Sequence, residues 1–139
     1  MTEPAAGRQL RRSIWAVVAG FLFVVVLTLA TDAILHLTGV FPPLPRRMSD
    51  GLFGLATAYR TVYGIAGSYL MARLAPAKPM KHALFGGAVG TVVSTVGAAV
   101  TWNHVPSLGP HWYSLALVAT ALPGAWVGAK LRLAELAKQ

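Results

Sequence analysis

The sequence lacks cysteine and has very few acidic residues. Its 139 residues include no Cys and only four Asp and Glu. The missing thiols exclude disulfides, thiol catalysis and thiolate metal sites. The acids are Glu3, Asp32, Asp50 and Glu135, and the first and last lie near the chain ends, so a paired-carboxylate mechanism has few residues to use.

Motifs that mark enzymes are missing as well. There is no P-loop, no HExxH and no G-x-S-x-G pattern. The string "GGAVG" lies within an apolar run and has no strand before it, so it does not fit a nucleotide-binding loop. We therefore expect a protein without enzymatic activity and without a cofactor.

Charge of either sign is scarce, whereas long apolar runs are abundant. Hydrophobic residues make up 55% of the chain and charged residues 12%, against about 25% charged residues in globular domains. Crossing the hydrocarbon layer takes roughly 20 mostly apolar residues. Four runs qualify: Ile14–Thr31, Gly51–Ala72, Ala83–Asn103 and Trp112–Ala129. This pattern predicts an all-α protein, a polytopic membrane four-helix bundle.

The expected organisation is one transmembrane domain with two short tails. We expect a tail at 1–12, a domain at 13–132 with helices at about 13–37, 51–74, 80–102 and 112–132, and a second tail at 133–139. Ser49 or Asp50 can cap the second helix by accepting its first free N–H groups. Pro123 should kink the fourth.

The positions of the basic residues predict the topology. The net charge is +8, and nine of the twelve Lys and Arg lie in the tail regions or in the connection between the second and third helices. The positive-inside rule then places both termini in the cytoplasm. The basic residues are expected to contact anionic lipid headgroups, not nucleic acid.

One alternative concerns the first apolar run. Arg11 and Arg12, the apolar stretch and the small residues near Ala30 also fit a signal peptide. Its cleavage would leave three spans.

Small residues form a stripe along each predicted helix. Spacing of three or four residues lets helix backbones approach closely in lipid. The glycines expected to pack in this way are Gly64, Gly86, Gly90, Gly124 and Gly128. A single small bundle cannot pair every stripe, so we also expect a homo-oligomer.

Two charges lie within or at the edge of apolar runs, where an isolated charge is costly. With 1.5 Å rise per residue, Asp32 lies ~7 Å and Arg60 ~13 Å below the outer boundary. Helical side chains tilt toward the helix N-terminus, so Arg60 points toward Asp32. The sequence predicts an Asp32–Arg60 ion pair, with His36 one turn above and Tyr59 or Tyr63 sharing hydrogen bonds.

The pair allows several interpretations. It can fix the register of two helices, or it can mark the path of an ion or solute. In a third interpretation Asp32 simply reaches interfacial water. A metal site is a further alternative, because His36, His104 and His111 are expected at one face with Asp32.

Three strings carry a resemblance to a known kind of protein: "TDAILHLTGVFPP", "TAYRTVYG…YLMARLAP…PMKHA" and "GPHWYSLALVATALPGAWVG". In these, the chain resembles a family of small uncharacterised bacterial inner-membrane proteins over most of 14–130. The resemblance implies a multi-pass protein with four spans in a bacterial inner membrane, and it carries no activity with it.

We therefore expect a small structural or accessory membrane protein held by Asp32 and Arg60. The alternative is an oligomeric channel or transporter for a small ion or solute that uses Asp32, Arg60, Tyr63 and His36.

Overall fold

The computed structural model describes residues 5–104 and 108–139, and these residues form helices without any strand. Residues 1–4 of the predicted tail and 105–107 of the predicted last loop lie outside the described residues. The elements are α1 (Ala5–Leu37), α2 (Asp50–Leu74), α3 (Pro79–Thr101), the 3-10 turn η1 (Trp102–His104) and α4 (His111–Ala137). The predicted all-α class is thereby confirmed.

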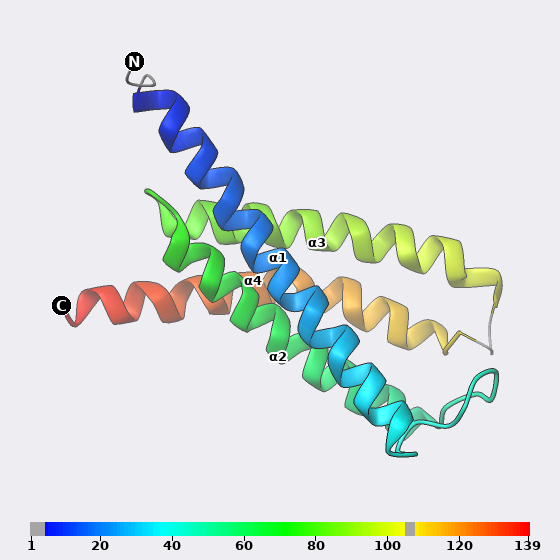
Figure 1. Ribbon diagram of the computed structural model, residues 1–139. Helices are drawn as coiled ribbons and strands as arrows, with labels where there is room; N and C mark the ends of the chain where they lie inside the picture. The colour runs from blue at the N-terminus through cyan, green and yellow to red at the C-terminus, as the bar shows by residue number, and fades with distance from the viewer. Residues whose placement is uncertain (1–4, 105–107) are drawn as a thin grey trace.

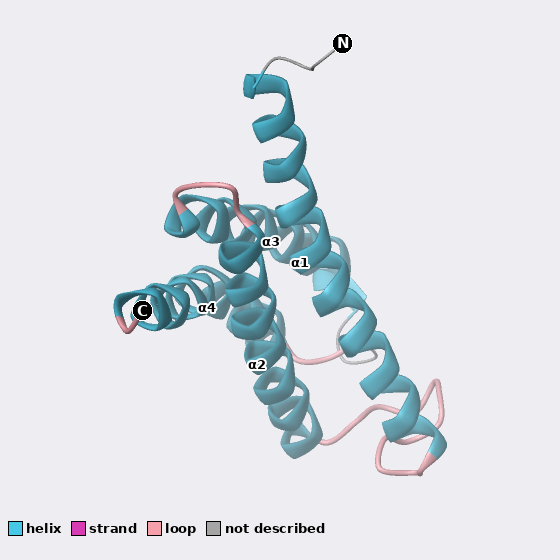
Figure 2. Cartoon of the chain, turned by 60° about the vertical axis from the view of Figure 1, so that its left-hand side comes forward, coloured by secondary structure: helices cyan, strands magenta, loops and turns pink. Residues whose placement is uncertain are grey.

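The four helices run up and down between two ends of the molecule (Figure 1). The described ends of the chain and the α2–α3 turn lie at one end, called here the terminus end. The α1–α2 loop, 38–49, and η1 lie at the other, called here the loop end. Helix α2 packs against α1, α3 and α4, while the N-terminal part of α1 projects away from the other helices (Figures 1 and 2).

Local sequence explains most helix boundaries. Ser49 is the N-cap of α2, and its side chain accepts from the Leu52 N–H, as predicted. Helix α1 begins at Ala5 and not at Ser13, because "AAGRQLRR" consists mainly of good helix formers. Helix α4 likewise continues through "LAELA" to Ala137, past the expected end at 132.

Three of the helices are long and apolar enough to cross a membrane: α1, α3 with η1, and α4. Their bulky apolar side chains face outward, which is the reverse of the pattern in a soluble bundle. On α1, for example, Trp15, Val26 and Leu29 are each more than 60% exposed. Helix α2 is less apolar, since it carries Arg60 among several hydroxyl side chains.

Glycines allow the closest helix contacts. A Cβ added to Gly128 of α4 would lie 2.4 Å from the carbonyl oxygen of Ile65 on α2. Helices α1 and α2 cross where Gly20 faces Gly67, and a Cβ on Gly20 would lie 2.7 Å from the Gly67 oxygen. Gly124 makes an ordinary contact, 3.5 Å from Ile65. These contacts hold α2 at the centre of the molecule.

Two of the glycines predicted to pack against a neighbouring helix face open space instead. A Cβ on Gly64 or Gly90 would meet nothing within 4 Å, and both residues line an internal cavity. Within this chain neither glycine makes the helix contact predicted for it, and packing against a second copy of the chain stays a prediction. The stripe spacing identifies helix faces with small residues, but it does not tell a contact from a space.

Candidate functional site

The two charges singled out in the sequence meet between helices α1 and α2. Arg60 on α2 donates from Nη2 to Oδ2 of Asp32 on α1, at 2.6 Å. The Tyr59 hydroxyl donates to Oδ1 of the same carboxylate. Both Asp32 oxygens therefore accept from α2, and the side chains of Asp32 and Arg60 are only 25% and 28% exposed.

A third helix joins through a residue that the sequence analysis did not select. Arg60 donates from Nη1 to the hydroxyl of Tyr113 on α4. The guanidinium also lies 5.9 Å from the Tyr59 ring centre and 5.8 Å from that of Tyr113, which is cation–π geometry. The four residues Asp32, Tyr59, Arg60 and Tyr113 are called here the charge cluster, and they connect α1, α2 and α4.

Apolar side chains cover the charge cluster toward the loop end. Phe41 of the loop, 3% exposed, packs with Phe53, Ala56 and Tyr113. The Phe53 and Tyr113 rings are 5.0 Å apart. This cover removes part of the ion pair from solvent on the loop side, and a lower local dielectric there strengthens the attraction between its charges.

Tyr63 and His36 lie beside the charge cluster and do not join it. The Tyr63 hydroxyl is 2.8 Å from Thr31 Oγ1, so it forms a separate link between α2 and α1. The His36 ring contacts the loop, with Nδ1 3.1 Å from the Pro42 oxygen and an edge contact to Phe41. The hydrogen bond to Asp32 that the sequence assigned to either tyrosine is made by Tyr59.

The histidines do not assemble as the metal alternative requires. Among the described residues, no group of three His, Cys, Asp or Glu side chains is placed to hold a metal ion. His111 instead stacks on Trp102 at 3.9 Å and approaches its carbonyl oxygen with Nε2. This geometry uses His111 to join η1 to the start of α4.

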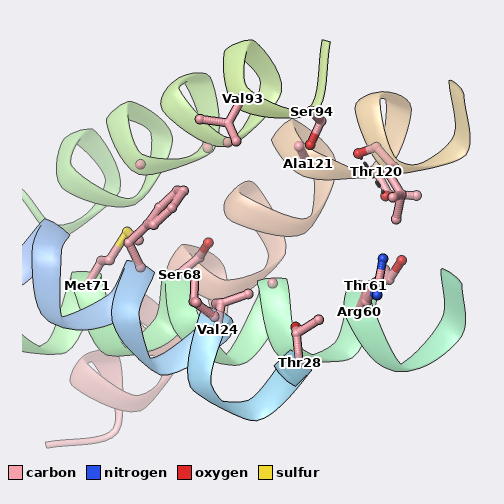
Figure 3. Close-up of a pocket in the computed structure, with 17 residues that line it drawn as sticks. Val24, Thr28, Arg60, Thr61, Ser68, Met71, Val93, Ser94, Thr120 and Ala121 are labelled. Atoms are coloured by element: carbon pink, nitrogen blue, oxygen red, sulfur yellow. Dashed lines mark hydrogen bonds between the residues drawn. The ribbon is translucent and has the colours of Figure 1, made fainter. Parts of the chain in front are cut away.

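A cavity of about 220 Å³ lies beside the charge cluster, on its terminus side (Figure 3). All four helices contribute to its wall, and Arg60 lies at one end. Met71 lies at the other end, where its side chain fills the space that Gly20 and Gly86 leave between α1 and α3. The cavity therefore runs along α2 from a charged end to an apolar end.

A second hollow lies between α1 and α3 nearer the terminus end. Its volume is about 540 Å³. The lining consists of Leu10, Ser13, Ile14, Val17, Val18, Lys81, His82 and Phe85. Its position agrees with the way in which the first turns of α1 diverge from the other helices (Figure 2).

A second polar cluster joins α2 to α4 near the terminus end. Tyr69 donates its hydroxyl hydrogen to Glu135 Oε2 at 2.6 Å, and Arg132 donates from Nη1 to the same oxygen at 2.6 Å. We call Tyr69, Arg132 and Glu135 the terminal cluster. The three-residue spacing of Arg132 and Glu135 on one helix was a signal that could have identified the pair.

Nothing in the sequence marked Tyr113 as a partner of Arg60, because its position at the start of a span is equally typical of an aromatic residue at the membrane boundary. Comparison of the chain with protein-family models, with curated proteins and with solved structures found no match.

Proposed function

We propose that the chain is a small inner-membrane protein in which α2 crosses the bilayer together with the three apolar helices. Helix α1 ends at the loop end and α3 begins at the terminus end, so α2 must cross wherever those two helices do. Its 25 residues extend ~37 Å, more than the ~30 Å hydrocarbon layer. Its main charge, Arg60, is paired within the bundle.

Both termini lie in the cytoplasm in this proposal. The terminus end carries nine of the twelve Lys and Arg, and the loop end only Arg46 and Arg47 outside the spans. This asymmetry follows the positive-inside rule. Anionic lipid headgroups are the partners that such a basic surface attracts, and a second copy of the chain is the partner proposed for the outward apolar faces.

The role that we propose is structural or accessory, without catalysis. The observation that carries it is the charge cluster, in which both Asp32 oxygens and two Arg60 nitrogens bind groups of the same chain. Polar groups directed at one another across three helices act as a clamp. Such a clamp fixes helix register in a bilayer, where apolar packing alone discriminates poorly between registers.

A double-mutant cycle tests the clamp. Unfolding in mild detergent is compared for the wild type, Asp32→Asn, Arg60→Gln and the double variant. Each single change should destabilise strongly, and the double change should recover much of the loss because no unpaired charge remains. Additive losses, or no losses, would show that the two charges do not form a clamp. Asp50→Asn at the exposed Arg47 pair is the matched control.

The cavity favours a second candidate function, an oligomeric channel or transporter for a small ion or solute. Of the residues expected for it, Arg60 lines the cavity, while Asp32, Tyr63 and His36 lie outside its lining. Reconstituted vesicles with the wild type and Asp32→Asn test this candidate. A flux of protons or potassium that Asp32→Asn abolishes would support it, whereas fluxes equal to those of empty vesicles would count against transport of either ion.

A further inference from the structure

The wall of the cavity changes in polarity along its length. At the end near Met71 it includes the apolar side chain of Val24, with Ser68 beside it (Figure 3). Toward the loop end, Thr28, Thr61 and Thr120 surround the space next to Arg60 (Figure 3). A molecule that fits this space has an apolar body and a polar head.

Several polar groups on the wall have donor capacity left. Within the described part of the chain, the hydroxyls of Thr28, Ser68 and Ser94 make no hydrogen bond, although each residue lines the cavity. Arg60 lies at one end of the cavity and donates from Nη1 to Tyr113 and from Nη2 to Asp32, and each of these nitrogens carries a second N–H. The free hydroxyls and the remaining N–H groups of these two nitrogens favour a bound molecule with an acceptor atom.

The charge balance selects a neutral molecule. Arg60 already has the Asp32 carboxylate at 2.6 Å, so the pair as a whole carries no net charge. A second anion would leave one negative charge unbalanced in a low-dielectric interior, which is costly. A neutral acceptor such as a hydroxyl or an amide oxygen can bind the remaining N–H and O–H groups without that cost.

The size and the opening of the cavity further restrict the class of molecule that can bind. A volume of about 220 Å³ exceeds the ~150 Å³ that holds benzene in an engineered cavity and is below the ~300 Å³ of the smallest drug-sized sites. Val25 on α1 and Val93 on α3 line the cavity and are 39% and 53% exposed. The opening thus lies between α1 and α3, where a span faces lipid.

We propose that this cavity binds one small neutral amphiphile, with its oxygen toward Arg60 and its apolar body toward Met71, which enters from the lipid between α1 and α3. Transport is not required, because the molecule can enter and leave by the same opening. The proposal also goes beyond the clamp, since the clamp needs no ligand.

The experiment uses the methionines as reporters. The chain has four, and of Met48, Met71 and Met80 only Met71 lines the cavity. The full-length protein, labelled with ¹³C at the methionine methyl groups, is titrated in detergent with benzyl alcohol. The Met71 methyl resonance should shift and saturate, while those of Met48 and Met80 stay unchanged. Equal unsaturable shifts of all three would show partition into the micelle and would overturn the proposal.

Probe chemistry tests the class of ligand. Toluene and benzoate have nearly the size of benzyl alcohol, but toluene lacks an acceptor and benzoate is charged. Each should bind at least tenfold more weakly than benzyl alcohol. Tighter binding of benzoate would overturn the neutral class, and equal binding of toluene would show that Arg60 and the hydroxyls do not recognise the ligand.

Glycine variants provide the matched control. A leucine at Gly90 has room for its Cβ and fills the cavity, whereas a leucine at Gly97 also meets open space but on a part of α3 outside the lining. Gly90→Leu should weaken benzyl alcohol at least tenfold, and Gly97→Leu should leave it unchanged. Unchanged binding in a folded Gly90→Leu protein would contradict the site. The Met71 titration of the wild type decides the matter if that variant does not fold.

Discussion

The charge cluster and the terminal cluster contain the same three kinds of group in different arrangements. In both, a tyrosine of α2 and an arginine donate to one carboxylate. The two tyrosines, Tyr59 and Tyr69, are ten residues apart, or ~15 Å along α2. Because the two clusters contain the same chemical groups, a difference in their contribution to stability reflects their different positions in the molecule.

The charge cluster is assembled from parts of the chain that are far apart, whereas the terminal cluster is mostly local. Asp32 and Arg60 come from different helices and are each less than a third exposed. Arg132 and Glu135 lie one turn apart on α4, and while the Arg132 side chain is 17% exposed, that of Glu135 is 41% exposed. An arginine–carboxylate pair thus links two helices in the charge cluster, whereas in the terminal cluster it stabilises a single helix.

The largest expected difference comes from removing one arginine at a time. Arg60→Gln leaves Asp32 without its cation between the helices, a change that costs about 3–5 kcal/mol for buried pairs. The Arg132 side chain is only 17% exposed, but Arg132→Gln leaves Glu135 in contact with solvent and with the Tyr69 hydroxyl, so it should cost much less. The free energies of unfolding of both variants in the same detergent test this prediction. Equal losses would contradict the stated difference between the two clusters.

A smaller difference is expected for the tyrosine hydroxyls. Tyr113→Phe removes an acceptor from the partly buried Arg60 and should cost about 1–3 kcal/mol. Tyr69→Phe leaves Glu135 with Arg132 and with solvent, so its cost should be smaller. Each phenylalanine keeps the ring, so the difference in unfolding free energy reports the hydroxyl alone. A larger loss for Tyr69→Phe would reverse the ranking of the two clusters.

The smallest effect concerns salt. At about 1 M salt the screening length falls to about 3 Å for charges in contact with solvent. The small penalty of Glu135→Gln should therefore vanish at high salt, while that of Asp32→Asn stays. Unfolding at low and high sodium chloride measures both, and a salt-sensitive Asp32→Asn penalty would place the charge cluster in contact with solvent.

The contact between Asp32 and Arg60 was predictable because it depends on two regular quantities. Rise per residue and the ends of the apolar runs set the depths of both side chains, and the cost of an isolated charge favours pairing. Tyr113 was not predictable in this way. Which residue of α4 approaches α2 depends on the rotation of α4 about its axis, and packing at Gly128 and Gly124 sets that rotation.

The glycine stripes also show that the sequence alone does not predict which helix faces meet. Gly86 and Gly128 have neighbouring atoms where a Cβ would stand, whereas Gly64 and Gly90 have free space there. A small residue permits a contact, and only the arrangement of all four helices decides whether the contact is made. Gly64 and Gly90 line the cavity, and no helix contact is made there.

The crossing of α1 over α2 at Gly20 and Gly67 has a mechanical consequence. The cavity beside Arg60 lies on one side of this crossing, and the hollow between α1 and α3 lined by Leu10 and Phe85 lies on the other. On the cavity side α1 is attached to α2 again, by the Asp32–Arg60 pair and by Thr31 and Tyr63, whereas on the other side its first turns project away from the other helices (Figure 2). The crossing therefore divides α1 into a segment held at both ends and a segment held at one end, so that movement of α1 should change the shape of the hollow more than that of the cavity.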